Sequence, residues 1–219
     1  MPDIVLEERK KLDLYASALS AVCFSGDSMY EVAMENKQIR RSYYRQGLDS
    51  WTSEPIKNAQ SLKQVLDWID YLGRRHRFND WTRKLSTMSE AGRERYIQSL
   101  DGHVHKVELL IVNRYLRRLP AGGIAAVDYA WSSFLCQAGL EFNYLTRDEY
   151  YAYLLQTARN AQRDYGGWNE YVIGFAAGIQ FVDRNMSTAY MEKEKSAITE
   201  LLTSRHSPFE KVSWSLELG

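Results

Sequence analysis

The densest group of metal-binding side chains lies at residues 101–105, where Asp101, His103 and His105 recur at every second position. Carboxylate and imidazole groups bind zinc when three or four of them converge. Metal-binding residues on a helix are usually four positions apart, whereas residues two apart point to nearly opposite sides. The chain also has no CxxC and no HExxH pattern. We therefore predict no metal site and no cofactor, and interpret Asp101 as the cap of a helix.

A single carboxylate, Asp128, interrupts the apolar run from Ile124 to Trp131. A buried carboxylate needs a partner or a shifted pKa, and perturbed carboxylates cluster at functional sites. Two interpretations follow. In the commoner one, Asp128 has a structural hydrogen bond or a salt bridge to an arginine. In the other, Asp128, Glu149 and a nearby arginine form a polar centre, which requires a concave pocket beside Asp128.

Motifs for nucleotide binding or nucleophilic catalysis are missing. Gly122 and Gly123 precede a helix and could present backbone N–H groups to an anion. Neither GxxxxGK[ST] nor GxGxxG occurs there, and the chain has no GxSxG nucleophile motif. We therefore interpret the two glycines as a turn between helices and predict no catalytic residues.

Two stretches interleave basic and aromatic residues. This pattern is typical of proteins that bind single-stranded nucleic acid, but arginine, tyrosine and tryptophan are also enriched at protein interfaces. The chain has 28 basic and 28 acidic residues, so its net charge gives no general attraction to nucleic acid. The pattern favours protein binding, and the predicted contact residues are Arg40, Arg41, Tyr43, Tyr44, Arg45, Arg74, Arg75, Arg77 and Trp81.

Hydrophobic periodicity predicts an all-α fold of about eight or nine helices. Period-two alternation is missing, and only the tail at 212–218 has a pattern compatible with a short strand. The four prolines fall outside the predicted helices, at or beyond their edges, where proline is tolerated. The predicted helices span residues 6–22, 29–48, 60–76, 88–100, 103–118, 123–140, 147–165, 168–184 and 190–204.

The clearest local signals lie between residues 144 and 185. Thr146 and Glu149 have the spacing of a capping box, so a helix should begin near Arg147. Gly166-Gly167 should end this helix. A glycine inside a helix costs about 1 kcal/mol relative to alanine. The pair Gly174 and Gly178, one turn apart, therefore predicts that another backbone approaches closely.

The segment 60–76 has an apolar face that includes Leu62, Leu66 and Ile69. Gly73 and the four basic residues that follow it are interpreted as the C-terminal end of this helix. Positive charge there complements the helix dipole. This interpretation explains the basic cluster without a ligand.

Length and composition predict one globular domain over residues 1–219, with a weak boundary near 119–123. The chain is 45% hydrophobic and 26% charged, which is typical of globular proteins. Cys23 and Cys136 lie in apolar contexts, so we expect free thiols in a reducing compartment. The N-terminal segment has no apolar run of signal-peptide length, and no segment has the roughly 20 apolar residues that span a bilayer. We expect a cytoplasmic protein without a membrane partner; the sequence does not define its oligomeric state.

The C-terminal half resembles a bacterial family catalogued as domain of unknown function twelve-sixty-six, small cytosolic proteins with no established activity. The resemblance rests on AVDYAWSSFL with Asp128, EFNYLTRDEYYAYLL, AQRDYGGWNEY with Trp168, and Gly178, and more loosely on ALSAV, Trp51 and LDWIDYLGRRHRF. It covers nearly the whole chain. The family pattern implies one arginine three residues after the Asp128 position and another just after the Gly178 position. This chain has Trp131 and Ile179 there. The resemblance therefore implies that any polar site shared by those groups has lost its positive partners here.

These observations favour a non-enzymatic, cytosolic protein-interaction module. Some family members lie near genes for polymorphic or Rhs-type toxins, so the resemblance implies an immunity protein that neutralises a cognate toxin by direct binding. The first alternative is an enzyme or small-ligand-binding protein centred on Asp128 and Glu149. The second is a nucleic-acid binder that uses the stretches 40–45 and 74–83.

Overall fold

Apolar side chains at three- and four-residue spacing fold most of the described chain into helices. The computed structural model describes residues 6–24, 35–52, 54–186, 198–199, 201–205 and 207–218. No strand occurs among these residues, and the predicted all-α fold class is confirmed. The helices with defined bounds are α1 (Leu6–Ala21), the 3-10 helix η1 (Val22–Phe24), α3 (Lys37–Ser50), α4 (Ala59–Tyr71), α5 (Gly73–Ser86), α6 (Glu90–Gln98), α7 (Lys106–Tyr115), α8 (Ala125–Glu141), α9 (Arg147–Asp164), α10 (Trp168–Asp183) and α12 (Pro208–Lys211).

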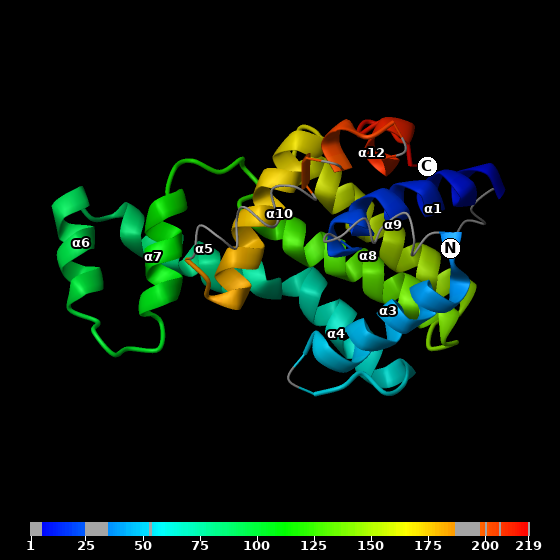
Figure 1. Ribbon diagram of the computed structural model, residues 1–219, viewed down its shortest axis with the longest axis horizontal. Coiled ribbons are helices and arrows are strands. Elements are labelled where there is room, and N and C mark those ends of the chain that lie inside the picture. Colours follow the sequence, from blue (N-terminus) through cyan, green and yellow to red (C-terminus); the bar gives the residue numbers. More distant parts are fainter. Residues whose placement is uncertain are drawn as a thin grey trace.

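Helix α8 is the centre of the fold. Its sequence is largely apolar around the whole circumference, and most of its residues are buried. Such a helix must be covered on every side. Accordingly, α8 contacts α1, α3, α4, α5, α9 and α10, and Figure 1 shows these helices arranged around it.

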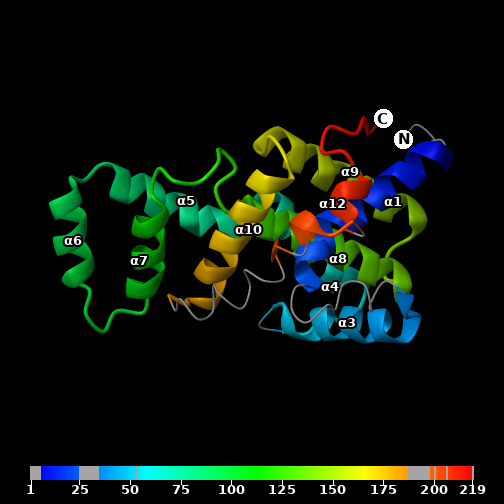
Figure 2. The same ribbon diagram turned by 45° about the horizontal axis from the view of Figure 1, so that its top comes forward.

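A second, smaller core lies where α5, α6 and α7 meet. Phe78 of α5 and Leu109 of α7 are buried there together with Phe181 of α10. Figures 1 and 2 both show α6 and α7 at the end of the molecule opposite α1. Because α10 contributes to both cores, the helices form one compact domain. The segment 119–123 connects α7 to α8, and a boundary there stays a prediction.

The local signals around α9 are confirmed. The Thr146 hydroxyl accepts a hydrogen bond from the Glu149 N–H at 3.3 Å, and the Glu149 carboxylate accepts one from the Thr146 N–H at 2.9 Å. Helix α9 begins at Arg147, as predicted. It ends at Asp164, just before the Gly166-Gly167 turn.

The predicted helix at 60–76 is wrong at its C-terminal end. Helix α4 ends at Tyr71, and a second helix, α5, runs from Gly73 to Ser86. Gly73 has φ +63°, the left-handed backbone that glycine adopts without strain. The basic residues at 74–77 therefore lie in the first turn of α5 and not in the last turn of α4. Their positive charge opposes the α5 dipole, so the predicted dipole explanation is wrong.

Other predicted bounds shift by a few residues. The segments predicted at 88–100 and 103–118 correspond to the shorter helices α6 and α7, and the one at 29–48 to α3. Parts of two predicted helices, residues 29–34 of one and residues 190–197 and 200 of the other, lie outside the described residues. Among the residues that are described, no helix is both long and apolar enough to cross a membrane.

The predicted C-terminal strand is wrong. The tail forms no strand between Val212 and Leu218; it lies against α9 and α10. The Trp168 indole N–H donates to the Val212 carbonyl at 2.8 Å, and the Gln162 amide donates to the Trp214 and Leu216 carbonyls. Side chains of the two helices thus occupy the backbone acceptors that a neighbouring strand would use.

Gly174 and Gly178 of α10 both lie against neighbouring atoms, but the predicted close backbone is present at only one of them. A Cβ on Gly174 would lie 2.7 Å from the backbone oxygen of Gly123, so the predicted close backbone is present there. At Gly178 the prediction is wrong, because the nearest atom is the Val127 side chain, at 2.3 Å. The two cysteines, Cys23 and Cys136, are free thiols as expected.

Candidate functional site

Asp128 occupies a structural position at the start of α5. Its buried carboxylate accepts hydrogen bonds from the backbone N–H groups of Arg74 at 2.7 Å and Arg75 at 3.0 Å, and from the Arg75 guanidinium at 3.1 Å. Burial raises the pKa of Asp128 above its ordinary value, and the charge of Arg75 and these hydrogen bonds offset only part of this rise. The carboxylate thus caps α5 and neutralises one arginine. This is the structural interpretation left open by the sequence.

The polar centre predicted from Asp128 and Glu149 is not assembled. Asp128 lines neither of the two cavities described below. Glu149 lies at the start of α9, in the capping box, where it also pairs with Lys63. The family positions at Trp131 and Ile179 provide no positive partner for the aspartate. Arg75 provides it instead, from a different helix.

The acidic and histidine side chains at 101–105 contact different neighbours and do not converge on one point. Among the described residues, no group of three or more histidine, cysteine or acidic side chains is placed to bind a metal. His105 Nδ1 lies 2.9 Å from the Glu108 carboxylate, and Asp101 pairs with Lys106. Asp101 does not cap a helix, because α7 begins only at Lys106, and its N-cap residue, His105, makes no side-chain capping bond.

The first basic stretch forms an exposed patch, but without all of its predicted members. Tyr44 is buried, and its hydroxyl donates to the Gln137 amide oxygen at 2.8 Å, so the prediction that Tyr44 contacts a partner is not supported by its position. Arg40 and Tyr43 are half-buried. The exposed members are Arg41 and Arg45.

Arg41 and Arg45 lie over one aromatic ring. Their guanidinium carbons are 5.0 and 4.0 Å from the centre of the Phe142 ring. Arg41 also pairs with Glu141 at 3.4 Å, and Arg45 donates to the Tyr144 hydroxyl at 3.5 Å. We call Arg41, Arg45, Phe142 and Tyr144 the arginine–aromatic patch. It joins α3 to the loop between α8 and α9, so residues about a hundred positions apart form one surface.

The second basic stretch is partly covered: Arg74, Arg75 and Trp81 are half-buried, and Arg77 is exposed. Arg75 is engaged by Asp128, and the Trp81 indole N–H donates to Glu108 at 3.4 Å. Arg74 and Arg77 line a cavity of about 340 Å³, which we call the basic cavity. Its lining residues are Trp68, Leu72, Gly73, Arg74, His76, Arg77, Glu108, Phe181, Val182 and Arg184.

Glu108 is the one carboxylate among those lining residues, and sequence reasoning missed it. It is buried in α7 and accepts hydrogen bonds from Arg77 at 3.3 Å and from Arg184 Nε at 3.0 Å. Burial raises the pKa of Glu108. Hydrogen bonds from His105, Arg184 and Trp81, together with the charge of Arg77, lower it by more, so the pKa of Glu108 lies below its ordinary value. The sequence signal that could have identified Glu108 is its place, as a glutamate, on the apolar face of the 103–118 segment.

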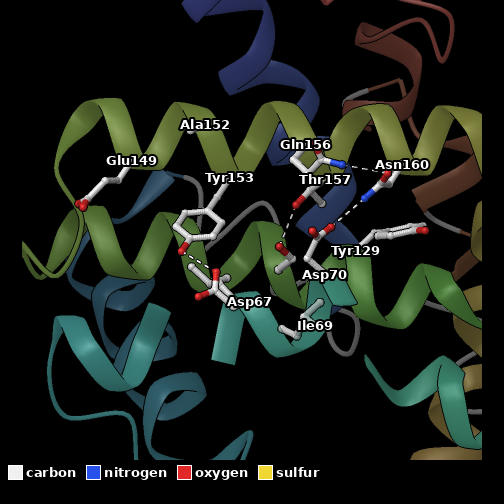
Figure 3. A pocket seen from close by; sticks show the side chains of 12 residues that line it. Asp67, Ile69, Asp70, Tyr129, Glu149, Ala152, Tyr153, Gln156, Thr157 and Asn160 are labelled. Atoms are coloured by element: carbon white, nitrogen blue, oxygen red, sulfur yellow. Dashed lines mark hydrogen bonds between the residues drawn. The ribbon is translucent and has the colours of Figure 1, made fainter. Parts of the chain in front are cut away.

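A second cavity, of about 270 Å³, lies between α4, α8 and α9; we call it the polar cavity (Figure 3). The Tyr153 hydroxyl donates to Asp67 Oδ1 at 2.9 Å, and the Asn160 amide donates to Asp70 Oδ1 at 2.9 Å. Its lining residues are Leu66, Asp67, Ile69, Asp70, Tyr129, Ser132, Glu149, Ala152, Tyr153, Gln156, Thr157 and Asn160.

The two aspartates of the polar cavity have no cationic partner among the described residues. Lys63, the nearest lysine along α4, pairs with Glu149 at the end of the cavity. Both aspartates lie outside the apolar face of α4 and are exposed. They border the cavity on the side of α4 that faces α9, as Figure 3 illustrates for Asp67 and Asp70.

Over the residues that the structure describes, the fold is helical, with an exposed arginine–aromatic patch, a cavity lined by arginines and a cavity lined by aspartates. A model of the family described as Protein of unknown function (DUF1266) matches residues 49–214. The chain therefore belongs to this family, as the sequence resemblance indicated. No curated protein and no solved structure gives a significant match to the chain.

Proposed function

We propose that the protein is a non-enzymatic interaction module that binds a protein partner through the arginine–aromatic patch. The observation that carries the proposal is the placement of two exposed guanidinium groups over the ring of Phe142. Arginine and aromatic residues dominate the energetic centres of protein interfaces. Stacking also restricts the arginine side chains before binding, which lowers the entropy cost of forming an interface.

The contacts of the histidines support a binding function over nucleophilic catalysis. His76 pairs with Asp80, His105 pairs with Glu108, and His103 accepts a hydrogen bond from the His105 N–H. In the described part of the chain, none of these histidines is hydrogen-bonded to a serine or cysteine. A serine or cysteine nucleophile normally needs such a base beside it.

The partner class that we propose is a toxin, with the protein acting as its immunity protein in the cytoplasm. This choice follows from the family resemblance and from the charge of the patch, which fits an acidic protein surface. The proposed neutralisation is by direct binding that covers the toxin.

The test compares two double variants in co-purification from a native lysate, with identification of the retained protein by mass spectrometry. R41A/R45A removes the two stacked arginines. R83A/R95A removes two exposed arginines of α5 and α6 and is the matched control. We expect the wild type and R83A/R95A to retain the same specific partner and R41A/R45A to lose it. Equal retention by all three, or no specific partner for any of them, contradicts the proposal.

A second candidate function is the binding of a small organic cation in the polar cavity. Asp67 and Asp70 supply two carboxylates without a cationic partner in the described chain, and Tyr129 and Tyr153 supply aromatic surface. A protonated diamine satisfies both features. The probe is 1,4-diaminobutane, titrated by calorimetry against the wild type, D67N/D70N and the exposed control D49N/E94Q. Binding that is lost only in D67N/D70N supports this function, and its absence in the wild type removes it.

A further inference from the structure

The basic cavity has more positive than negative charge on its walls. Three guanidinium groups, those of Arg74, Arg77 and Arg184, face one carboxylate, that of Glu108. Glu108 is already fully engaged, because it also binds Trp81 and His105. One glutamate neutralises one arginine. The cavity lining therefore carries about two uncompensated positive charges before a partner is considered.

Two of the arginines are held by Glu108 and keep donors for another group. Arg77 uses Nη1 toward the glutamate, and Arg184 uses Nε and Nη2. Arg184 ends α10 in a left-handed conformation, with φ 51° and ψ 40°, which turns the chain at the cavity. The remaining N–H groups of both arginines, on Arg77 Nε and Nη2 and on Arg184 Nη1, have no hydrogen-bond partner among the described residues.

Arg74 is the least satisfied of the three. Its Nε is buried and has no hydrogen-bond partner in the described chain, and its one side-chain hydrogen bond is a long contact of 3.4 Å from Nη2 to the Trp51 carbonyl. The guanidinium lies 5.5 Å from the ring centres of both Trp51 and Trp68. Nearly all buried donors in folded proteins have a partner. The unpartnered Nε therefore shows that the described protein groups do not fully satisfy this half-buried guanidinium.

The electrostatics of Arg74 agree with this geometry. Burial lowers the pKa of Arg74, Asp128 opposes this effect, and the charge of Arg77 lowers it further. Asp128 attracts the guanidinium without a hydrogen bond to it, because its oxygens bind Arg75 and two backbone N–H groups. An anion in the cavity would favour the charged form of Arg74.

Apart from His76, which pairs with Asp80, the rest of the lining has no polar side chain. Trp68, which is 36% exposed, forms one wall together with Leu72, Phe181 and Val182. A bare inorganic anion would leave this surface without a contact. A ligand with a dianionic head and a ring or hydrocarbon body uses both parts of the cavity, and arginine is the residue best suited to bind phosphate by two parallel hydrogen bonds.

We propose that the basic cavity is a binding site for a small organic phosphate monoester. The phosphate lies among the guanidinium groups of Arg74, Arg77 and Arg184, and the organic part lies against Trp68. The two negative charges of the monoester match the excess charge of the lining. This site shares no residue with the arginine–aromatic patch, so the proposal does not depend on the proposed protein partner.

The test measures binding of four probes by calorimetry: phenyl phosphate, inorganic phosphate, benzoate and a dT oligonucleotide. We expect phenyl phosphate to bind most tightly, because it alone combines a dianion with a ring of suitable size. Inorganic phosphate that binds as tightly would overturn the organic part of the proposal. No binding of phenyl phosphate, or tighter binding of benzoate or the oligonucleotide, overturns the proposal as a whole.

Variants locate the site. R77Q removes an arginine whose side chain is 57% exposed, so the protein should stay folded, and R74Q removes the buried one. R83Q, in the same helix but outside the cavity, is the charge-matched control. We expect the dissociation constant for phenyl phosphate to rise at least tenfold in R77Q and to stay within twofold in R83Q. If R74Q does not fold, R77Q alone decides, and equal affinity of R77Q and R83Q overturns the assignment.

Discussion

Asp128, at the centre of the fold, accepts a 2.7 Å hydrogen bond from the backbone N–H of Arg74, at the start of α5. A carboxylate at this position satisfies N–H groups that a helix leaves without partners in its first turn, and it interacts favourably with the positive end of the helix dipole. The same contact fixes where Arg74 and Arg77 enter the basic cavity. The central helix therefore positions the site through one side chain.

The first prediction is that D128N strongly destabilises the protein. Asparagine keeps the shape, but its amide nitrogen would face donors on Arg75, and the arginine would lose its counter-ion. Breaking a buried pair by removing one partner costs about 3–5 kcal/mol. Urea denaturation of D128N and of the exposed control D49N measures the difference. A loss below about 1 kcal/mol in D128N contradicts the structural role.

The second prediction concerns Gly73, which adjoins this carboxylate. A Cβ at Gly73 would lie 2.3 Å from Asp128 Oδ2, and its φ of +63° is unfavourable for other residues. Gly102 has a similar φ of +76°, but no atom lies within 4 Å of a Cβ there. G102A should cost about 1–2 kcal/mol for the backbone alone. G73A should cost at least about 2 kcal/mol more, because a clash is added. Equal losses in the two variants would show that the clash is relieved without cost.

The difference between predicted and missed elements follows from the range of the interactions. The start of α9 depends on Thr146 and Glu149, three residues apart, so the sequence is sufficient to predict it. The start of α5 depends on Asp128, more than fifty residues away, and its own N-cap residue, Leu72, has no capping side chain. Local patterns therefore joined α4 and the first turn of α5 into one helix and left the rest of α5 unassigned.

The candidate sites were predictable to a smaller degree. Composition identified Arg41 and Arg45 as surface residues, and they lie at the surface. It also selected Tyr44, which is buried, because residue type alone does not show which side of a helix faces the core. Glu108 and Arg184 come together across α7 and α10, 76 positions apart, and no local pattern links them.

The third prediction is a compensating pair in the packing of α8 against α10. A Cβ at Gly178 would lie 2.3 Å from Val127 Cγ2, so G178A should destabilise the protein although alanine favours helix. Truncation to V127A removes the clashing methyl group at a cost of about 2 kcal/mol or more. In the double variant the two losses should not add, and a coupling of at least about 1 kcal/mol is expected. Denaturation of all four proteins gives this coupling, and strict additivity would refute the contact.

The fourth prediction is a pH-dependent contribution from Glu149. The hydrogen bond from Lys63 and then the one from the Thr146 backbone lower the pKa of Glu149 to about 2, compared with about 4.3 in an unfolded chain. A depressed carboxyl pKa stabilises the fold above the unfolded value, and this stabilisation is lost as pH falls from about 4.3 to about 2. Because Glu149 is partly exposed, solvent screening limits the effect to about 1 kcal/mol at pH 6.

The measurement compares E149Q with the wild type by urea denaturation between pH 6 and pH 2.5. Glutamine retains the capping geometry, so the variant removes only the charge and its pair with Lys63. The wild type should be more stable at pH 6, and the two curves should converge as the pH approaches 2.5. E94Q, at an exposed site in α6, serves as the control and should show no such convergence. A difference that stays constant with pH would mean that Glu149 contributes only through its neutral hydrogen bonds, with no role for the Lys63 charge.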